Sequence, residues 1–136
     1  MSVDKPFVLF VCRHNTGRSQ MAEAYLRHFA GDAIEVASAG TEGAEGPNAG
    51  VVAAMAEDGI DISHARSKLI DPSVAALADR IITMGCDVVG VPRIDEDWGL
   101  PDPKGQTPER VREIRDMTKS RAAALARTLL ESSPVR

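Results

Sequence analysis

The stretch FVLFVCRHNTGRSQ, residues 7–20, joins three kinds of segment in close succession. Its first part, FVLFVC, is a continuous apolar run rich in valine and phenylalanine, which is typical of a strand buried on both faces of a parallel sheet. A short polar loop containing one glycine follows, and from Arg18 the apolar residues Met21, Tyr25 and Phe29 recur at helical spacing. The stretch therefore predicts a strand, a tight connection and an amphipathic helix.

The rest of the chain continues this alternation of strands and helices. Further strands are expected over residues 34–40, 80–86 and 93–98, and further helices over residues 49–57, 71–78 and 107–130. In the last helix the apolar residues expected to face the core are Val111, Ile114, Met117, Leu125 and Leu129. Such alternation predicts an α/β fold of three layers (αβα), with a four-stranded parallel sheet and helices on both of its faces. No repeat, linker or low-complexity tract divides residues 1–136, so a single domain is expected.

Composition and charge exclude several classes of protein. The 136 residues are 43% hydrophobic and 26% charged, which is ordinary for a globular protein. A formal net charge of −4 argues against general nucleic-acid binding, which depends on clustered cations. No stretch is apolar over enough length to span a membrane, and the N-terminal apolar run is too short for a signal peptide. We therefore expect a cytoplasmic protein in which Cys12 and Cys86 are free or catalytic thiols.

The loop after the first strand has the composition of an oxyanion site. In an open parallel sheet, ligands bind beyond the carboxyl ends of the strands, where Cys12 is expected. Backbone N–H groups of a short loop can form an anion nest, and the positive end of the following helix stabilises a thiolate. Arg18 supplies a planar fork able to bind two oxygens of a tetrahedral anion. The residues expected around the oxyanion are Arg13, His14, Asn15, Thr16, Gly17, Arg18 and Ser19, although Arg13 and His14 could equally be solvated loop cations.

The segment VCRHNTGRSQMAEAY, residues 11–25, resembles the phosphate-binding loop and first helix of the low-molecular-weight protein tyrosine phosphatase fold. Its NTGRSQMAEA portion is most similar to the arsenate reductase branch, whose members are thioredoxin-coupled or transfer arsenate to mycothiol. The similarity extends through EVASAG, GIDIS, IITMG and EDWGLPDPKGQ, and so covers nearly the whole chain. The resemblance implies that Cys12 is the nucleophile and Arg18 the oxyanion clamp, that Ser19 donates a hydrogen bond to the thiolate, and that Asn15 braces the loop.

Expelling an oxygen from an oxyanion centre requires a proton donor held over the site. Asp102 lies between Pro101 and Pro103, and from these residues alone a simple turn is the favoured interpretation. The resemblance instead implies a catalytic acid, because the family's acid occupies the matching position of an Asp-Pro loop.

The residues after Asp102 bear on the choice of substrate. Phosphatases of this fold typically place aromatic residues after the Asp-Pro pair to stack on phosphotyrosine, whereas Lys104 and Gly105 stand here. A site without these aromatic side chains lacks a stacking interaction worth about 0.5–1.5 kcal/mol with a phenyl ring. A small tetrahedral anion has no ring and does not need this interaction. We therefore predict an arsenate reductase for which phosphate and sulfate are competing anions. The alternatives are a phosphotyrosine phosphatase and a non-catalytic anion-binding module.

Reduction of arsenate requires a second thiol, and Cys86 is the candidate within this chain. Related thioredoxin-coupled reductases carry two further cysteines in this region, but CDVVGVPRIDEDW holds no third cysteine. Two routes stay open. Either Cys86 attacks Cys12 directly and thioredoxin reduces the disulfide, or an external small thiol attacks and Cys86 is a buried strand residue. No bound cofactor is expected; the reductant would be thioredoxin, glutathione with glutaredoxin, or mycothiol with mycoredoxin.

The sequence predicts no metal site, and His28 and His64 are expected at the surface. Some reductases of this family hold a potassium ion with residues that match Asn15, Glu23 and Ser38. The later acidic ligand is replaced here by Lys68, so we expect its ammonium group to occupy the place of that cation.

Overall fold

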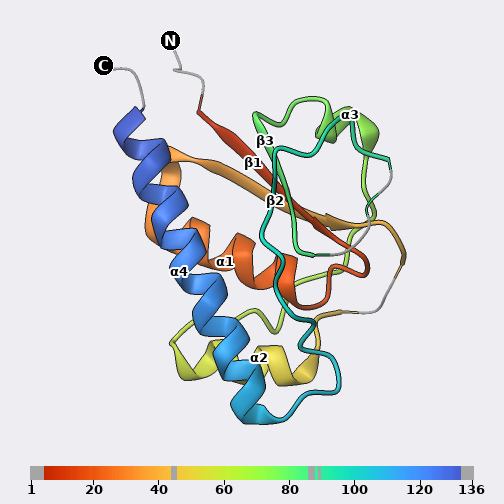
Figure 1. The fold of residues 1–136 in the computed structure, drawn as a ribbon, viewed down its shortest axis with the longest axis vertical. Coiled ribbons are helices and arrows are strands. Elements are labelled where there is room, and N and C mark those ends of the chain that lie inside the picture. The colour runs from red at the N-terminus through yellow and green to blue at the C-terminus, as the bar shows by residue number, and fades with distance from the viewer. Residues whose placement is uncertain (1–4, 44–45, 86–87, 89, 133–136) are drawn as a thin grey trace.

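The structure is a computed structural model that describes residues 5–43, 46–85, 88 and 90–132. A four-stranded, fully parallel sheet in the order β2-β1-β3-β4 lies at its centre (Figure 1). Its strands are β1 (Phe7–Cys12), β2 (Glu35–Gly40), β3 (Arg80–Thr83) and β4 (Glu96–Asp97). The carboxyl ends of these strands lie at one edge of the sheet, which is where the functional site forms.

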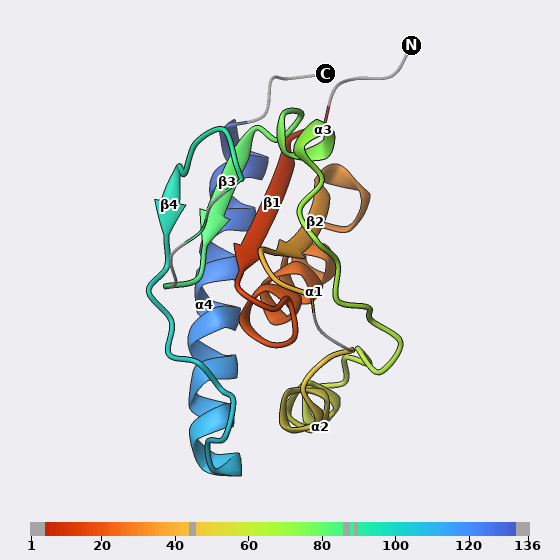
Figure 2. The same ribbon diagram turned by 90° about the vertical axis from the view of Figure 1, so that its right-hand side faces the viewer.

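Helices cover both faces of the sheet, which confirms the predicted three-layer α/β fold (Figure 2). The helices are α1 (Arg18–Ala30), α2 (Ala49–Glu57), α3 (Pro72–Ala75) and α4 (Pro108–Ser132), and a 3₁₀ turn (Gly31–Ala33) follows α1. The helices α1 and α4 pack together over one face, and the short α3 lies on the other. In the described part of the chain, no helix combines the length and the apolarity that crossing a membrane requires.

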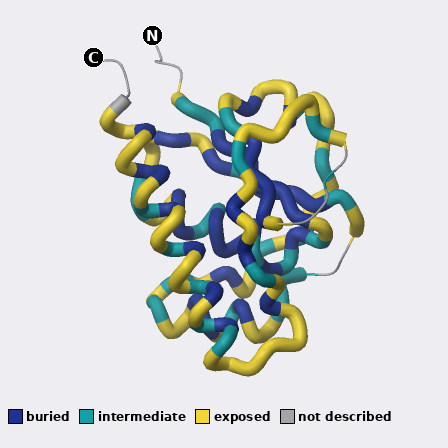
Figure 3. The backbone as a smooth tube through the Cα atoms, viewed as in Figure 1, coloured by how far each residue is buried: buried dark blue, intermediate teal, exposed yellow. Residues whose placement is uncertain are grey.

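The apolar run of β1 is buried on both faces, as its composition predicts. Val8 and Phe10 pack into the cluster formed with α1 and α4, whereas Leu9 and Val11 pack toward α3. Alternation in a strand sends successive side chains to opposite faces, so both faces need cover. Figure 3 shows this burial running through the centre of the molecule. Removing such a side chain from water contributes roughly 1.5–3 kcal/mol.

Most predicted elements are confirmed, but three are markedly shorter than expected. The strand expected over 93–98 consists of Glu96–Asp97 alone. The strand expected over 80–86 ends at Thr83, and Cys86 lies outside the described residues. The helix expected over 71–78 is a single turn, although Asp71 caps it as expected by accepting from the Ser73 N–H at 2.9 Å.

The prediction that Met117 faces the core is wrong. Met117 is 37% exposed, whereas Thr118 is fully buried. Thr118 lies four residues after the buried Ile114 and therefore on the same helical face. Its hydroxyl donates to the Ile114 carbonyl at 2.8 Å, so a polar residue can occupy this core position.

Candidate active site

The nucleophile loop, residues 13–17, connects β1 to α1 at the carboxyl edge of the sheet. Cys12 closes β1 and is only 3% exposed. Asn15 adopts a positive φ of 57°, a left-handed conformation that asparagine tolerates better than most residues. In this conformation its backbone N–H donates to the Cys12 Sγ at 3.2 Å. The loop therefore turns a backbone donor onto the sulfur.

A buried side-chain relay provides a second contact to the sulfur. The Asn15 amide nitrogen Nδ2 donates to the Ser19 Oγ at 2.8 Å, and the Ser19 Oγ lies 2.8 Å from the Cys12 Sγ. Because the serine oxygen already accepts from Asn15, its own hydrogen is free to be donated to the sulfur. Two hydrogen-bond donors are thus directed at the sulfur. Asn15 is fixed in turn, because its Oδ1 accepts from the Lys68 N–H at 3.0 Å and from Gln20 Nε2 at 3.1 Å.

The end of β2 supports the nucleophile loop by direct backbone contact. A Cβ at Gly40 would lie 2.7 Å from the Arg13 carbonyl oxygen, so no larger residue fits without moving the loop. The Glu42 N–H donates to that same carbonyl at 2.8 Å. Gly40 is not among the site residues predicted from the sequence; the small residues of EVASAG were the available signal.

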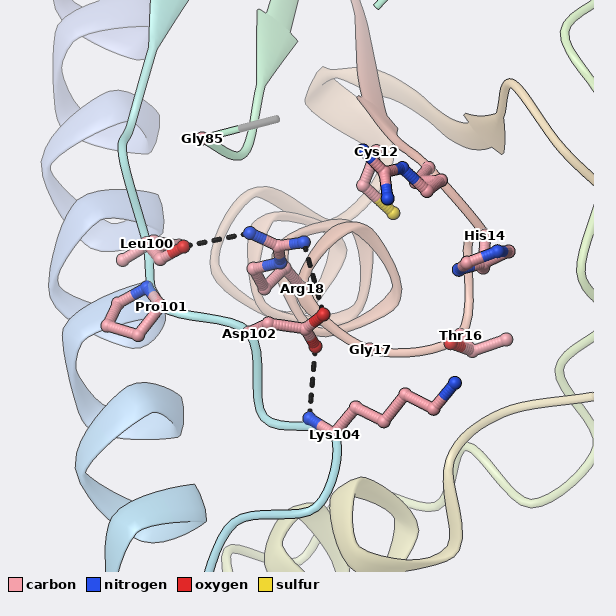
Figure 4. A pocket seen from close by; sticks show the side chains of 11 residues that line it. Cys12, His14, Thr16, Gly17, Arg18, Gly85, Leu100, Pro101, Asp102 and Lys104 are labelled. Carbon is pink, nitrogen blue, oxygen red and sulfur yellow. Dashed lines mark hydrogen bonds and ion pairs between the residues drawn. The ribbon is translucent and has the colours of Figure 1, made fainter. Parts of the chain in front are cut away.

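Arg18 begins α1, and its side chain is 11% exposed. Its Nη1 donates to two backbone carbonyls, those of Met84 and Leu100, each at 2.9 Å. Figure 4 shows the bond to Leu100. Its Nη2 lies 3.8 Å from the Asp102 Oδ2. One nitrogen of the guanidinium is thus anchored to the residue after β3 and to the loop that carries Asp102. The other terminal nitrogen faces the Asp102 carboxylate.

Asp102 forms a turn and also faces the site. Its Oδ1 accepts from the Lys104 N–H at 3.0 Å, which leaves Oδ2 directed toward Arg18 (Figure 4). The side chain is 60% exposed and therefore accessible to solvent. Pro103 packs against the nucleophile loop, since a Cβ at Gly17 would lie 2.9 Å from the Pro103 Cγ. Asp102 can thus form the turn with one carboxylate oxygen while the other stays available to act as a proton donor.

These residues surround one cavity of about 610 Å³. Arg13 and His14 lie at its rim, where Glu42 pairs with both at 3.7 Å and 3.4 Å. No phenylalanine, tyrosine or tryptophan is among the described residues that line it. Those residues are Cys12, Arg13, His14, Thr16, Gly17, Arg18, Gly85, Leu100, Pro101, Asp102 and Lys104. Of the seven residues expected around the oxyanion, Asn15 and Ser19 are buried behind the sulfur rather than on the cavity wall.

Behind the loop, Lys68 contacts two of the three residues expected to hold a cation, Asn15 and Glu23. Its Nζ lies 3.2 Å from the Arg66 carbonyl oxygen, 3.5 Å from the Asn15 Oδ1 and 3.9 Å from the Glu23 Oε1. Ser38 donates its hydroxyl to the same Glu23 oxygen. Among the residues that the structure describes, no group of three or more His, Cys, Asp or Glu side chains could hold a metal ion.

Comparison with known proteins places this geometry in a family. The sequence model for low molecular weight phosphotyrosine protein phosphatases matches residues 7–93. An arsenate reductase of Staphylococcus epidermidis is 36% identical over 124 residues, which cover 87% of this chain and 94% of the relative.

Two solved structures give the same result. The thioredoxin-dependent arsenate reductase of Corynebacterium glutamicum matches with a TM-score of 0.84 at 35% identity, over 98% of this chain and 66% of that chain, so this chain spans just under two thirds of its length. An arsenate reductase in the phosphate binding state matches with a TM-score of 0.80 at 34% identity, over 91% of this chain and 98% of the other. From its sequence match and its fold, this chain belongs to the low molecular weight phosphotyrosine protein phosphatase family.

Proposed function

We propose that this chain is an arsenate reductase with Cys12 as nucleophile, Arg18 as oxyanion clamp and Asp102 as general acid. The observation that carries the proposal is that all three side chains line one cavity that has no Phe, Tyr or Trp among its described residues. A small tetrahedral anion matches such a cavity better than an aryl phosphate. Relatives that are 34–36% identical and cover most of the chain are named arsenate reductases, which supports the same substrate.

The first step is nucleophilic attack by the Cys12 thiolate on arsenic. Arg18 binds two of the arsenate oxygens with its free donors, since its Nη1 is engaged with the Met84 and Leu100 carbonyls. Asp102 gives a proton from Oδ2 to the departing oxygen, which leaves as water. The S–As bond forms as the As–O bond breaks, and arsenic remains As(V) in the covalent adduct.

The second step is reductive and needs an external thiol. Its thiolate attacks the Cys12 sulfur, the S–As bond breaks, and the electron pair goes to arsenic, which leaves as arsenite. The two sulfurs are oxidised to a disulfide, so electrons balance at two for each arsenate. The attacking thiol in our proposal is a small thiol such as glutathione or mycothiol, with a redox protein regenerating Cys12. Thioredoxin is the alternative, because it serves the Corynebacterium glutamicum relative.

The reaction draws on a reducing thiol pool, which fits the cytoplasmic location expected from the sequence. The described elements share one sheet and the layers on its two faces, and this supports residues 1–136 acting as a single domain.

The test is arsenate reduction by the purified chain, assayed in parallel with thioredoxin, with glutathione plus glutaredoxin, and with mycothiol plus mycoredoxin. We expect turnover in at least one system and its loss in Cys12→Ser and Asp102→Asn. Hydrolysis of p-nitrophenyl phosphate by the same preparation tests the related phosphatase activity that the family description favours. Efficient hydrolysis without arsenate reduction in any system would replace the proposal with that activity.

Cys86→Ala separates the two routes for the second thiol. If a small thiol attacks the adduct, this variant retains arsenate reduction when the small-thiol system is supplied. Cys12→Ser is the matched control, because it removes the other thiol and should abolish turnover. Loss of turnover in Cys86→Ala, with Cys12 still reactive to iodoacetamide, would make Cys86 the resolving thiol.

A further inference from the structure

We propose that Asp97 is a positioning residue for Arg18, holding in place the two backbone carbonyls on which the guanidinium is anchored. The inference rests on the proposed function only for its turnover readout; its anion-binding readout is independent of the reaction catalysed. Asp97 belongs to the edge strand β4 and is absent from the described lining of the cavity, so it acts through Arg18 and not on the substrate.

The anchor of Arg18 is built from two chain segments that are distant in sequence. Nη1 donates to the Met84 carbonyl, just beyond β3, and to the Leu100 carbonyl in the loop that leads to Asp102. Since one nitrogen makes both contacts, the direction of the guanidinium plane depends on the relative placement of these two carbonyls. The remaining donors of the fork can meet two anion oxygens only if that plane is held.

A single oxygen of Asp97 joins the same two segments. Its Oδ1 accepts from the Gly85 N–H at 2.6 Å and from the Thr83 hydroxyl at 2.9 Å, which are the residues on either side of Met84. It also lies 3.4 Å from the N–H of Gly99, the residue before Leu100. A charged acceptor makes stronger hydrogen bonds than a neutral one, and here it receives donors from both segments.

Besides Asp97, the described hydrogen bonds give this junction one backbone link, from the Trp98 N–H to the Thr83 carbonyl at 2.9 Å. The strand β4 has only two residues, and its register with β3 consists of two pairs. At the junction itself two glycines meet: a Cβ at Gly85 would lie 3.0 Å from the Gly99 Cα, and Gly85 has a positive φ of 95°. The backbones touch there, and neither residue has a side chain to lock the contact. The carboxylate of Asp97 adds side-chain contacts on the Gly85 and Gly99 side of that link.

The experiment measures phosphate binding by isothermal titration calorimetry and kcat/KM for arsenate in three variants. Asp97→Ala removes the acceptor, and we expect phosphate affinity and kcat/KM to fall by roughly tenfold, because small misplacements of a binding group are costly. Asp97→Asn keeps an acceptor oxygen at the same distance and should stay within about threefold of the parent chain. Alkylation of Cys12 by iodoacetamide without anion should be unchanged in both, since no contact between Asp97 and the nucleophile loop is among the described hydrogen bonds.

Asp95→Ala is the matched control. Asp95 is two residues away and also braces β3, accepting from the Ile81 N–H at 2.8 Å, but it touches neither carbonyl segment. It should therefore lower stability without changing phosphate affinity. If Asp97→Ala fails to fold, Asp97→Glu takes its place, because the added methylene displaces the acceptor while keeping the charge.

A double-mutant cycle tests whether the effect passes through Arg18. The Arg18→Lys variant has no planar guanidinium group at this position. In that background, Asp97→Ala should therefore cause no further loss of phosphate affinity. Wild-type affinity in a folded Asp97→Ala, equal losses in Asp97→Asn and Asp97→Ala, or an undiminished loss in the Arg18→Lys background would each overturn the proposal. Normal phosphate effects without arsenate reduction would instead refute only the proposed function.

Discussion

At the scale of single residues, the sulfur of Cys12 is contacted by two groups that stand behind it. Ser19 and the Asn15 N–H contact the sulfur at 2.8 Å and 3.2 Å, and neither contact requires a bound anion. Both groups are buried, so solvent does not compete for them. The hydrogen-bond donors around the sulfur are therefore preformed.

Ser19→Ala removes one of these contacts. A hydrogen bond to a charged group contributes roughly 1.5–3 kcal/mol, so we expect iodoacetamide alkylation of Cys12 at pH 6 to slow by about tenfold or more. Ser67→Ala is the control, because the Ser67 hydroxyl donates to the Asn15 carbonyl at 3.2 Å but does not touch the sulfur. An alkylation rate in Ser19→Ala equal to that of the control would show that the serine does not activate the nucleophile.

Lys68 carries a second prediction at this scale. Its ammonium already lies 3.9 Å from the Glu23 Oε1 and 3.5 Å from the Asn15 Oδ1, so the parent chain should be equally active in potassium chloride and sodium chloride. Lys68→Met removes the ammonium from the Asn15 Oδ1 and the Glu23 Oε1, while Arg27 still pairs with the Glu23 Oε2 at 2.9 Å. Activity should then become stimulated by potassium. Strong activation of the parent chain by potassium over sodium would contradict this role.

At the scale of elements, charged contacts tie α2 to α4 beneath the active site. Glu57 accepts from the Arg112 Nε at 3.0 Å and from the Arg115 Nη1 at 2.9 Å. Hydrogen bonding from Arg112, with a smaller effect of Arg115, holds the pKa of Glu57 below its usual value. Next to it, Lys119 and then the Tyr25 hydroxyl lower the pKa of Asp58 by hydrogen bonding. Burial, followed by the bond to Asp58, raises the pKa of Tyr25.

These shifts predict a loss of stability in acid. A carboxyl group whose pKa is lower in the folded state stabilises the fold above its unfolded pKa, which is about 4, and this contribution disappears as the pH falls through the folded value. Urea denaturation at pH 7 and pH 3 should show a smaller pH dependence in the double variant Glu57→Gln/Asp58→Asn. Glu113→Gln, which removes a pair within α4 alone, should leave the dependence unchanged. An unaltered dependence in the double variant would exclude these carboxylates as its source.

At the scale of the whole molecule, the cavity is lined by segments that are far apart in sequence. Its described walls come from the end of β1, the start of α1, the residue Gly85 after β3, and the acid loop around Asp102. An anion bound by Arg18 therefore contacts a surface that exists only in the folded chain. Ligand binding and global stability must be linked.

Phosphate should accordingly stabilise the protein against unfolding. At a concentration 100 times its Kd, the linkage relation gives an increase of about 2.7 kcal/mol in the free energy of unfolding. Chemical denaturation with and without phosphate measures this, with chloride at equal ionic strength as the control. Arg18→Lys should lose most of the increase. An increase that is the same in that variant would place the binding elsewhere.

The sequence was sufficient for features that depend on neighbouring residues. The run FVLFVC predicted β1, the spacing of Met21 and Tyr25 predicted the buried face of α1, and Asp71 before Pro72 predicted a helix cap. Failures occurred where a local pattern met a tertiary requirement. Met117 has the hydrophobicity of a core residue, but the face of α4 that packs on α1 passes through Thr118 instead.

By itself, the sequence determined the alternating α/β order, the loop with Cys12 and Arg18 at its ends, and a chemistry directed at a small oxyanion. These follow from periodicity and side-chain chemistry within a few residues of one another. Only the tertiary structure decided that Gly40 supports the loop, that Met84 and Leu100 anchor Arg18, and that Asp97 joins their segments. Each of those contacts has a backbone atom on at least one side, and every residue possesses such atoms. The sequence therefore does not identify these partners before the sheet brings its strand ends together.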